Sequence, residues 1–335
     1  MGAIINIMEL KEYGGYFGLE LPRKKEIFSD IAEEDKLRVN CGRAALYYAV
    51  QGFKRVYMPY FNCINSVDPV LQANIEVSYY HLSDELLPLN VNPKDNETVV
   101  WINYYGNATA KTIQKVVDSF ENLIIDNCQA FFSPPVMTKN VKNIYSVRKF
   151  LGTSDGGYLI GNGLNCIQPP KSFSSDSSLF LLKTIEYGTN TIYPESLKNE
   201  QRLSKNISGM SDLTKRILSS IDYDFIKNQR KLNLIRIHKN LGQLNEFKIN
   251  LESETHMFYP LLIMKEGLRE HLLKNKIYCP TLWRHVPEQC GYTDPETTFS
   301  KYMLLLPIDQ RYDLNDMDNI SEIVWQAYKL NLKGD

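Results

Sequence analysis

The chain has 335 residues, of which 43% are hydrophobic and 23% charged, so it can bury the core of one large domain or of two smaller ones. Lysine and arginine total 38 against 39 aspartate and glutamate residues, which gives a net charge of −1. This balance argues against nucleic-acid binding through a strong basic field and against a polybasic membrane anchor. No apolar run reaches the roughly 18–20 residues that span a bilayer, so no membrane association is expected.

The start of the chain does not resemble an export signal. Residues 3–8 are mostly apolar, but they are too few for the core of a signal peptide and no basic residue precedes them. Six cysteines are scattered along the chain without a close pair, at Cys41, Cys63, Cys128, Cys166, Cys279 and Cys290. We therefore expect a cytoplasmic protein whose cysteines are reduced thiols.

In chain order, the first 160 residues alternate short apolar runs with helical patterns, which is typical of an α/β sheet. Strands are expected at residues 55–58, 75–80, 98–103, 122–125, 143–145 and 157–160, and helices at 43–51, 64–73 and 110–120. Residues 99–102 show little alternation of apolar and polar side chains, as expected for a strand that is covered on both faces. These patterns predict a doubly wound, mostly parallel sheet.

The second half of the chain differs from the first in composition and in hydrophobic pattern. Residues 168–209 are rich in Ser, Lys, Asn and Pro and are expected to form loops and short helices. A long helical pattern follows at 213–247, with apolar residues at Leu218, Ile221, Phe225, Leu232, Ile235 and Leu241. Strand patterns at 257–264 and 303–306, with helices near 268–274 and 320–330, predict a smaller α+β region. We therefore predict a large domain over 1–210, including an N-terminal arm, and a small C-terminal domain over 211–335.

One constellation of residues can carry chemistry. Asp126 ends an apolar strand, and reactive groups of α/β sheets collect at the carboxyl ends of strands. A carboxylate there can hold a cationic ring nitrogen, Lys149 can form a Schiff base, and the hydroxyl of Ser146 can bind a phosphate. Gly42 and Arg43 open a helix whose free backbone N–H groups also suit a phosphate. Together these are the parts of a pyridoxal phosphate (PLP) site.

The chain also resembles the DegT/StrS-type aminotransferases, which are fold-type I PLP enzymes that mostly aminate keto-sugars attached to nucleotides. The segments that carry this resemblance are residues 14–17 (GGYF), 40–46 (NCGRAAL), 58–63 (MPYFNC), 103–106 (NYYG), 125–130 (IDNCQA) and 146–149 (SVRK). The resemblance implies that the large domain binds PLP and that the protein is a homodimer. It further implies transfer of an amino group from glutamate or a similar donor to a keto-sugar nucleotide, as in polysaccharide biosynthesis.

Carried over position by position, the resemblance gives the matching residues their roles around the cofactor ring. It implies that Lys149 binds PLP covalently and moves the proton during transamination. Asp126 is expected to pair with the pyridine nitrogen, and Gln129 to approach the 3-hydroxyl side of the ring. The lysine also argues against the dehydratase branch of the family, in which a histidine stands at this position.

The remaining expected contacts surround the phosphate and the substrate. The resemblance implies that Ser146 and the amides of Gly42 and Arg43 hold the phosphate. Cys63 occupies the position where relatives stack an aromatic ring on the cofactor. Two aromatic residues are expected to contact the substrate, namely Tyr105 and Trp283.

Three departures from the family pattern leave other functions open. Cys63 replaces the stacking aromatic residue, Asn103 replaces a common histidine, and the spacing from Ser146 to Lys149 is shorter than in many sugar enzymes. One alternative is a PLP enzyme that acts on a different amine or ketone. The other is a catalytically impaired family member that acts as a binding partner.

Other site patterns are weaker. Residues 152–156 satisfy the Gly-x-Ser-x-Gly pattern of hydrolases around Ser154, but a strand pattern follows where the nucleophile elbow requires a helix. Cys279, His285 and Cys290 match no common zinc spacing and lack a fourth ligand, so no metal site is expected. The glycine-rich loops of dinucleotide-binding proteins and P-loop NTPases are missing from the sequence.

Overall fold

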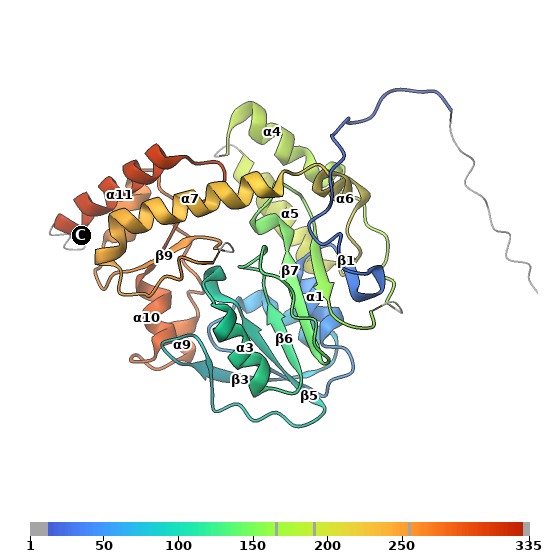
Figure 1. Ribbon diagram of the computed structural model, residues 1–335, viewed down its shortest axis with the longest axis horizontal. Coiled ribbons are helices and arrows are strands. Elements are labelled where there is room, and N and C mark those ends of the chain that lie inside the picture. Colours follow the sequence, from blue (N-terminus) through green and yellow to red (C-terminus); the bar gives the residue numbers. More distant parts are fainter. Residues whose placement is uncertain (1–12, 165–166, 190–191, 254–255, 331–335) are drawn as a thin grey trace, which may run out of the picture.

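The computed structural model describes residues 13–164, 167–189, 192–253 and 256–330, so the N-terminal segment 3–8 and Cys166 lie outside the described residues. An eight-stranded sheet with the order β1-β8-β7-β6-β5-β2-β3-β4 dominates it (Figure 1). The strands are β1 (Lys36–Val39), β2 (Arg55–Pro59), β3 (Glu76–Leu82), β4 (Pro88–Leu89), β5 (Glu97–Ile102), β6 (Leu123–Asp126), β7 (Val141–Ser146) and β8 (Gly157–Ile160). The five central strands pair in parallel, while β4 and β8 pair antiparallel with their neighbours. The predicted α/β class with a mostly parallel sheet is confirmed.

The central strands are buried on both faces. Successive side chains of a strand point to opposite sides of the sheet. Val100 of β5 accordingly joins an apolar cluster with helix α1 (Gly42–Ala49), whereas Val99 and Trp101 join a second cluster with helix α3 (Ala110–Ser119). Every residue of β5 is buried, which explains why this segment of the sequence shows so little alternation.

The other helices are α2 (Asp68–Gln72), α4 (Leu179–Tyr187), α5 (Tyr193–Lys205), α6 (Asp212–Leu218), α7 (Tyr223–Leu241), α8 (Leu268–Lys274), α9 (Val286–Gln289), α10 (Pro295–Tyr302) and α11 (Leu314–Lys329). Helix α5 has 13 residues in a region where only loops and short helices are expected. Only two of its side chains are buried, so its sequence carries little apolar periodicity. The pattern at 213–247 is divided into α6 and α7, because Asp222 accepts the N–H of Phe225 at 3.0 Å and starts a new helix.

A second, two-stranded sheet of β9 (Tyr259–Leu262) and β10 (Met303–Leu306) packs with α7, α8 and α11 in a third apolar cluster. Figure 1 shows α7 and α11 side by side on this part of the molecule. The buried stripe of α7 differs from the predicted one, since three of the expected apolar residues are exposed: Phe225, Leu232 and Ile235. The stripe instead includes Arg230 and Asn233, which donate to the side chain of Gln310 and to the carbonyl of Tyr312. The predicted boundary at residue 210 falls between α5 and α6 and stays a prediction.

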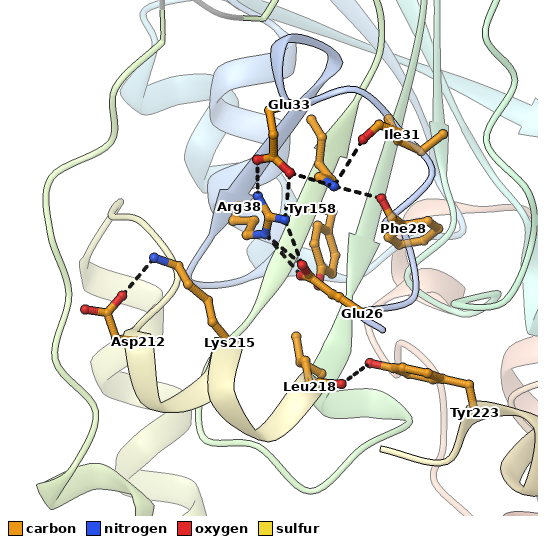
Figure 2. A network of polar contacts seen from close by, with 11 residues as sticks. Glu26, Phe28, Ile31, Glu33, Arg38, Tyr158, Asp212, Lys215, Leu218 and Tyr223 are labelled. Carbon is orange, nitrogen blue, oxygen red and sulfur yellow. Dashed lines mark hydrogen bonds and ion pairs between the residues drawn. The ribbon is translucent and has the colours of Figure 1, made fainter. Parts of the chain in front are cut away.

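The segment before β1 is held by a network of charged side chains (Figure 2). Arg38 of β1 donates to Glu26 at 2.7 Å and to Glu33 at 2.6 Å, so one guanidinium binds two carboxylates of this segment. The hydroxyl of Tyr158 on β8 also donates to Glu26. The buried ammonium of Lys36 donates to two backbone carbonyls of the same segment, at 2.7 and 3.2 Å. These contacts fix the arm against the edge of the sheet.

Two further observations concern the whole described part of the chain. Within it, no helix combines the length and the apolar character that crossing a bilayer requires. Five cysteines are free thiols: Cys41, Cys63, Cys128, Cys279 and Cys290.

Candidate active site

The candidate site lies at the carboxyl ends of β6 and β7, two adjacent parallel strands. Asp126 is the last residue of β6 and stands opposite Ile144 of β7, which ends two residues later at Ser146. One carboxylate oxygen of Asp126 accepts the backbone N–H of Cys128 at 2.8 Å. This bond turns the chain directly after the strand and fixes the carboxylate at the edge of the sheet.

Helix α1 begins beside this edge, at Gly42. A side-chain carbon at this position would lie 2.6 Å from the sulfur of Cys128 and 3.5 Å from Cβ of Ser146, so glycine is required for the close approach. Within the described residues, the side chain of Cys41 does not cap the helix. The first backbone N–H groups of α1 therefore lack a side-chain cap, and such a helix start can bind a phosphate.

Lys149 ends a short 3₁₀ turn (Val147–Lys149) that follows β7. Its side chain is exposed, whereas Ser146 at the start of the turn is buried. Burial raises the pKa of the Cys128 thiol well above its ordinary value, the charge of Asp126 raises it further, and the charge of Lys149 opposes both effects. Asp126 ends β6 and Lys149 follows the end of the adjacent parallel strand β7 by three residues, so both lie at the same edge of the sheet.

Gln129 supports the turn that follows β5. Its side-chain carbonyl accepts the backbone N–H of Tyr105 at 2.8 Å, and the carbonyl of Tyr105 accepts the N–H of Met257 at 2.9 Å. Tyr105 has a φ of 60°, a conformation that costs a non-glycine residue about 1–3 kcal/mol. Its side chain is fully buried, and its hydroxyl has no hydrogen-bond partner among the described residues. A contact between Tyr105 and substrate would therefore require this turn to open.

The structure places the other predicted contacts in different surroundings. Trp283 packs edge-on against Phe61, with 4.6 Å between ring centroids, inside the apolar cluster that covers one face of the sheet. Cys63 is half-buried before a short 3₁₀ turn. The Nε of Arg43 is buried without a partner in the described part of the chain, and its guanidinium donates to the carbonyl of Glu200 at 3.5 Å. Gly42, Asp126, Ser146 and Lys149 are thus brought together, while Trp283 belongs to the aromatic packing.

Sequence reasoning does not single out Glu200, which lies on α5. Its carboxylate forms an ion pair with Arg148, the residue before Lys149. Burial lowers the pKa of Arg148, although the guanidinium keeps this carboxylate partner. The pair joins the lysine turn to α5. No sequence signal indicated it, because α5 lies in the region where loops and short helices were expected.

The Gly-x-Ser-x-Gly motif at residues 152–156 has a structural role. The hydroxyl of Ser154 is buried 2.6 Å from that of Ser178, and β8 follows the motif in place of a helix. The neighbouring Asp155 is fully buried and accepts hydrogen bonds from Ser211 at 2.9 Å and from the hydroxyl of Thr214. These contacts join the motif to the start of α6 and contradict the geometry of a nucleophile elbow.

The mostly parallel sheet with helices packed on both faces agrees with the α/β architecture that the sequence resemblance implies. No protein-family model and no curated protein matches the sequence. Solved structures of the DegT/StrS type do match it, which confirms the resemblance at the level of the fold.

Three of these matches illustrate the likeness. The sugar aminotransferase CalS13 from Micromonospora echinospora is 13% identical, with 87% of each chain covered and a TM-score of 0.59. Spr1654 from Streptococcus pneumoniae in its PMP form is 12% identical, again with 87% of each chain covered and a TM-score of 0.60. The GDP-4-keto-6-deoxymannose-3-dehydratase ColD, bound to GDP-perosamine, is 14% identical over 86% of this chain and 88% of its own, with a TM-score of 0.60. At such identities the matches establish the fold.

Proposed function

We propose that this protein is a PLP-dependent aminotransferase that moves an amino group from glutamate or a similar donor to a keto-sugar nucleotide. The observation that supports this most strongly is the close approach of Gly42 to the ends of β6 and β7, where Asp126, Ser146 and Lys149 lie. The fold shared with sugar aminotransferases supports it independently.

The residues at this edge of the sheet fit PLP. A phosphate would be held by the hydroxyl of Ser146 and by the N–H groups at the start of α1, where Gly42 allows the helix to approach the strand ends. The carboxylate of Asp126 is fixed by the N–H of Cys128 and would hold a proton on the pyridine nitrogen by charge and hydrogen bonding. The exposed amine of Lys149 is accessible for a covalent bond to the cofactor.

When bound, PLP supplies an electron sink for the bonding electrons that are released when a proton leaves the substrate carbon. The chain must hold the ring, orient the substrate and move that proton. Lys149 has an amine on a flexible stem, so it can take the proton from one carbon and return it to another, a role that contributes about 10²–10⁴-fold to the rate. The ion pair between Arg148 and Glu200 holds the backbone of the lysine turn while its side chain moves.

A lysine at position 149 also favours transamination over sugar dehydration. One matching structure is a dehydratase and another is a sugar aminotransferase, so the fold is compatible with both reactions. In the dehydratase branch, the family resemblance implies a histidine at this position. Lys149 therefore supports return of the proton to carbon and release of an amino sugar.

We further propose that the active form is a homodimer in the cytoplasm. Helix α4 presents three large apolar side chains to solvent, because Leu179, Leu182 and Ile185 are 52%, 56% and 83% exposed. An exposed apolar face of this kind is typical of an interface between copies. The five free thiols fit a reducing compartment.

The cofactor assignment is tested by mapping the covalent attachment of PLP. Wild-type protein is incubated with PLP, reduced with borohydride, digested and analysed by mass spectrometry, and Lys149→Ala and Lys139→Ala are treated in parallel. Lys139 is an exposed lysine just before β7, so it controls for non-specific labelling. We expect one adduct at Lys149, which is retained in Lys139→Ala and lost in Lys149→Ala. Labelling spread over surface lysines, or unchanged in Lys149→Ala, would refute the assignment.

The substrates are tested separately in half-reactions. Glutamate should convert the bound cofactor to its amine form in wild-type protein, and a keto-sugar nucleotide should restore it. Asp126→Ala should keep the adduct at Lys149 but lose most of the half-reaction with glutamate. Restoration by a simple ketone but by none of a panel of keto-sugar nucleotides would favour a PLP enzyme of different specificity.

A further inference from the structure

A second group of chemically reactive side chains lies between β3 and the segment around α10. His81 comes from β3, Cys290 and Asp294 from the connection between α9 and α10, and Glu296 from the first turn of α10. Each side chain offers one atom that can ligate a metal, and these four atoms all lie within 4.8 Å of one another. None of the four belongs to the candidate PLP site.

Two of the separations within this group match those of a tetrahedral metal site. The Nδ1 atom of His81 lies 3.3 Å from Oε1 of Glu296 and 3.7 Å from Oδ2 of Asp294. In a tetrahedral zinc site with bonds of about 2.0–2.3 Å, neighbouring ligand atoms are about 3.3–3.7 Å apart. These two pairs of atoms therefore need almost no movement to bind one ion.

The carboxylate of Glu296 supplies an independent observation that points to a cation. Its side chain is fully buried, and Oε1 accepts the N–H of Leu82 at 2.6 Å, whereas Oε2 is buried without a partner in the described part of the chain. A buried carboxylate oxygen without a hydrogen bond is costly, because it has lost its hydration. The side chains of His81 and Asp294 are 46% and 34% exposed, so an ion can reach the cluster from solvent.

We propose that His81, Cys290, Asp294 and Glu296 bind one divalent transition-metal ion, with zinc as the preferred ion. The set contains one imidazole nitrogen, one thiolate sulfur and two carboxylate oxygens, which suits a borderline-soft ion. Calcium and magnesium prefer sites made entirely of oxygen ligands. With four protein ligands the site is closed, so its role is structural. This proposal is independent of the proposed aminotransferase activity.

The ion would fasten α10 to β3, which lies next to the edge strand β4. Three residues of α10 (Pro295, Thr298 and Phe299) line a cavity of about 800 Å³, together with Trp101 and Tyr104. Fixing the first turn of α10 therefore also fixes one wall of this cavity. The spacing of Cys290 with Cys279 and His285 did not reveal the site, because the histidine ligand comes from β3.

The test measures zinc retained by the full-length protein. The protein is equilibrated with Zn²⁺, passed through a desalting column with a weak chelator, and analysed for zinc per chain. Wild type should retain one equivalent, and Glu296→Gln and His81→Gln should retain less than a tenth of that amount. The matched control is Cys279→Ser, a half-buried thiol outside the cluster, which should retain one equivalent. His81→Gln alters an exposed side chain, so it provides a variant that does not disturb the core.

Cobalt provides a second readout that tests the ligand set. Co²⁺-loaded wild type should show the intense visible bands of a tetrahedral ion and a thiolate-to-cobalt charge-transfer band, and Cys290→Ser should lose the latter. If wild type retains no zinc, or if zinc is retained equally by the His81 and Glu296 variants, the proposal is wrong. The cluster is then a histidine–carboxylate ion pair.

Discussion

The close approach of α1 to the strand ends makes a prediction for Gly42→Ala. The new methyl group would stand 2.6 Å from the sulfur of Cys128, whereas atoms in van der Waals contact are about 3.5–4.0 Å apart. The helix or the thiol must therefore move by about 1 Å. Overpacking of this kind costs roughly 1–3 kcal/mol, and replacing a helical glycine by alanine gains up to about 1 kcal/mol. On balance, Gly42→Ala should lose about 1–2 kcal/mol of stability.

The sulfur of Cys128 is a specific obstacle, so a second substitution should restore stability. Cys128→Ala alone should cost about 1 kcal/mol, close to the value for one buried methylene. In the double variant Gly42→Ala/Cys128→Ala, the methyl group enters the space that the sulfur leaves. Its stability should lie within about 0.5 kcal/mol of wild type, so the two substitutions should be coupled by roughly 2 kcal/mol.

Urea unfolding of wild type, both single variants and the double variant measures this coupling. Gly152→Ala is the matched control, because a carbon at position 152 meets no atom within 4 Å and its stability should change by less than about 0.5 kcal/mol. If the double variant loses the sum of the two single losses, the helix does not approach Cys128 as the structure shows. The phosphate site proposed at this helix start would then lose its main support.

Two further predictions concern the N-terminal arm and α4. Hydrogen bonds from Arg38 lower the pKa of Glu33 to about 2, and they lower the pKa of Glu26 despite its burial. Both carboxylates thus stabilise the fold above their unfolded pKa of about 4.3, and this stability is lost as the pH falls toward 2. Because Glu33 is 70% exposed, most of this pH-dependent stability should come from Glu26. Glu26→Gln should lower the free energy of unfolding by about 1–3 kcal/mol at pH 7. It should also reduce the further loss of stability below about pH 4, and urea midpoints measured as a function of pH test both expectations. If Glu26→Gln loses as much stability below about pH 4 as wild type does, Glu26 is not the source of the pH dependence. For the proposed dimer, Ile185→Glu should halve the mass measured by sedimentation equilibrium. Leu273→Glu on α8 replaces another exposed apolar side chain and should leave the dimer mass unchanged. If both variants have the same mass, α4 is not part of the interface.

The sheet could be predicted from the sequence because its signals are local. Apolar runs and the residues at their ends identify β6 and β8, and the helix over 268–274 and the strand over 303–306 have the expected bounds. The residues proposed for the cofactor also carry local signals. Asp126 ends a strand, and Ser146 and Lys149 are three positions apart, so short-range patterns with a family resemblance were sufficient.

Contacts between distant segments could not be predicted in this way. The buried stripe of α7 contains Arg230 and Asn233, whose polar atoms are satisfied by residues about 80 positions away, and no helical periodicity reveals such partners. The approach of Gly42 to Cys128 and the group formed by His81 and Glu296 also depend on the order of the strands in space. These contacts depend on the three-dimensional arrangement of the strands, which local sequence patterns do not specify.

Gln129 combines two roles, namely the cofactor contact that the family resemblance implies and support of the turn at Tyr105. Its carbonyl oxygen holds the strained turn at Tyr105, and this bond helps to offset a backbone cost of about 1–3 kcal/mol. A glutamine also carries an NH₂ group with two donors, which the bond to Tyr105 does not use. These donors suit the hydroxyl oxygen on the pyridine ring, the contact that the family resemblance implies. Replacement by glutamate keeps the acceptor for the turn but removes these donors, so the two roles of Gln129 can be separated by one substitution.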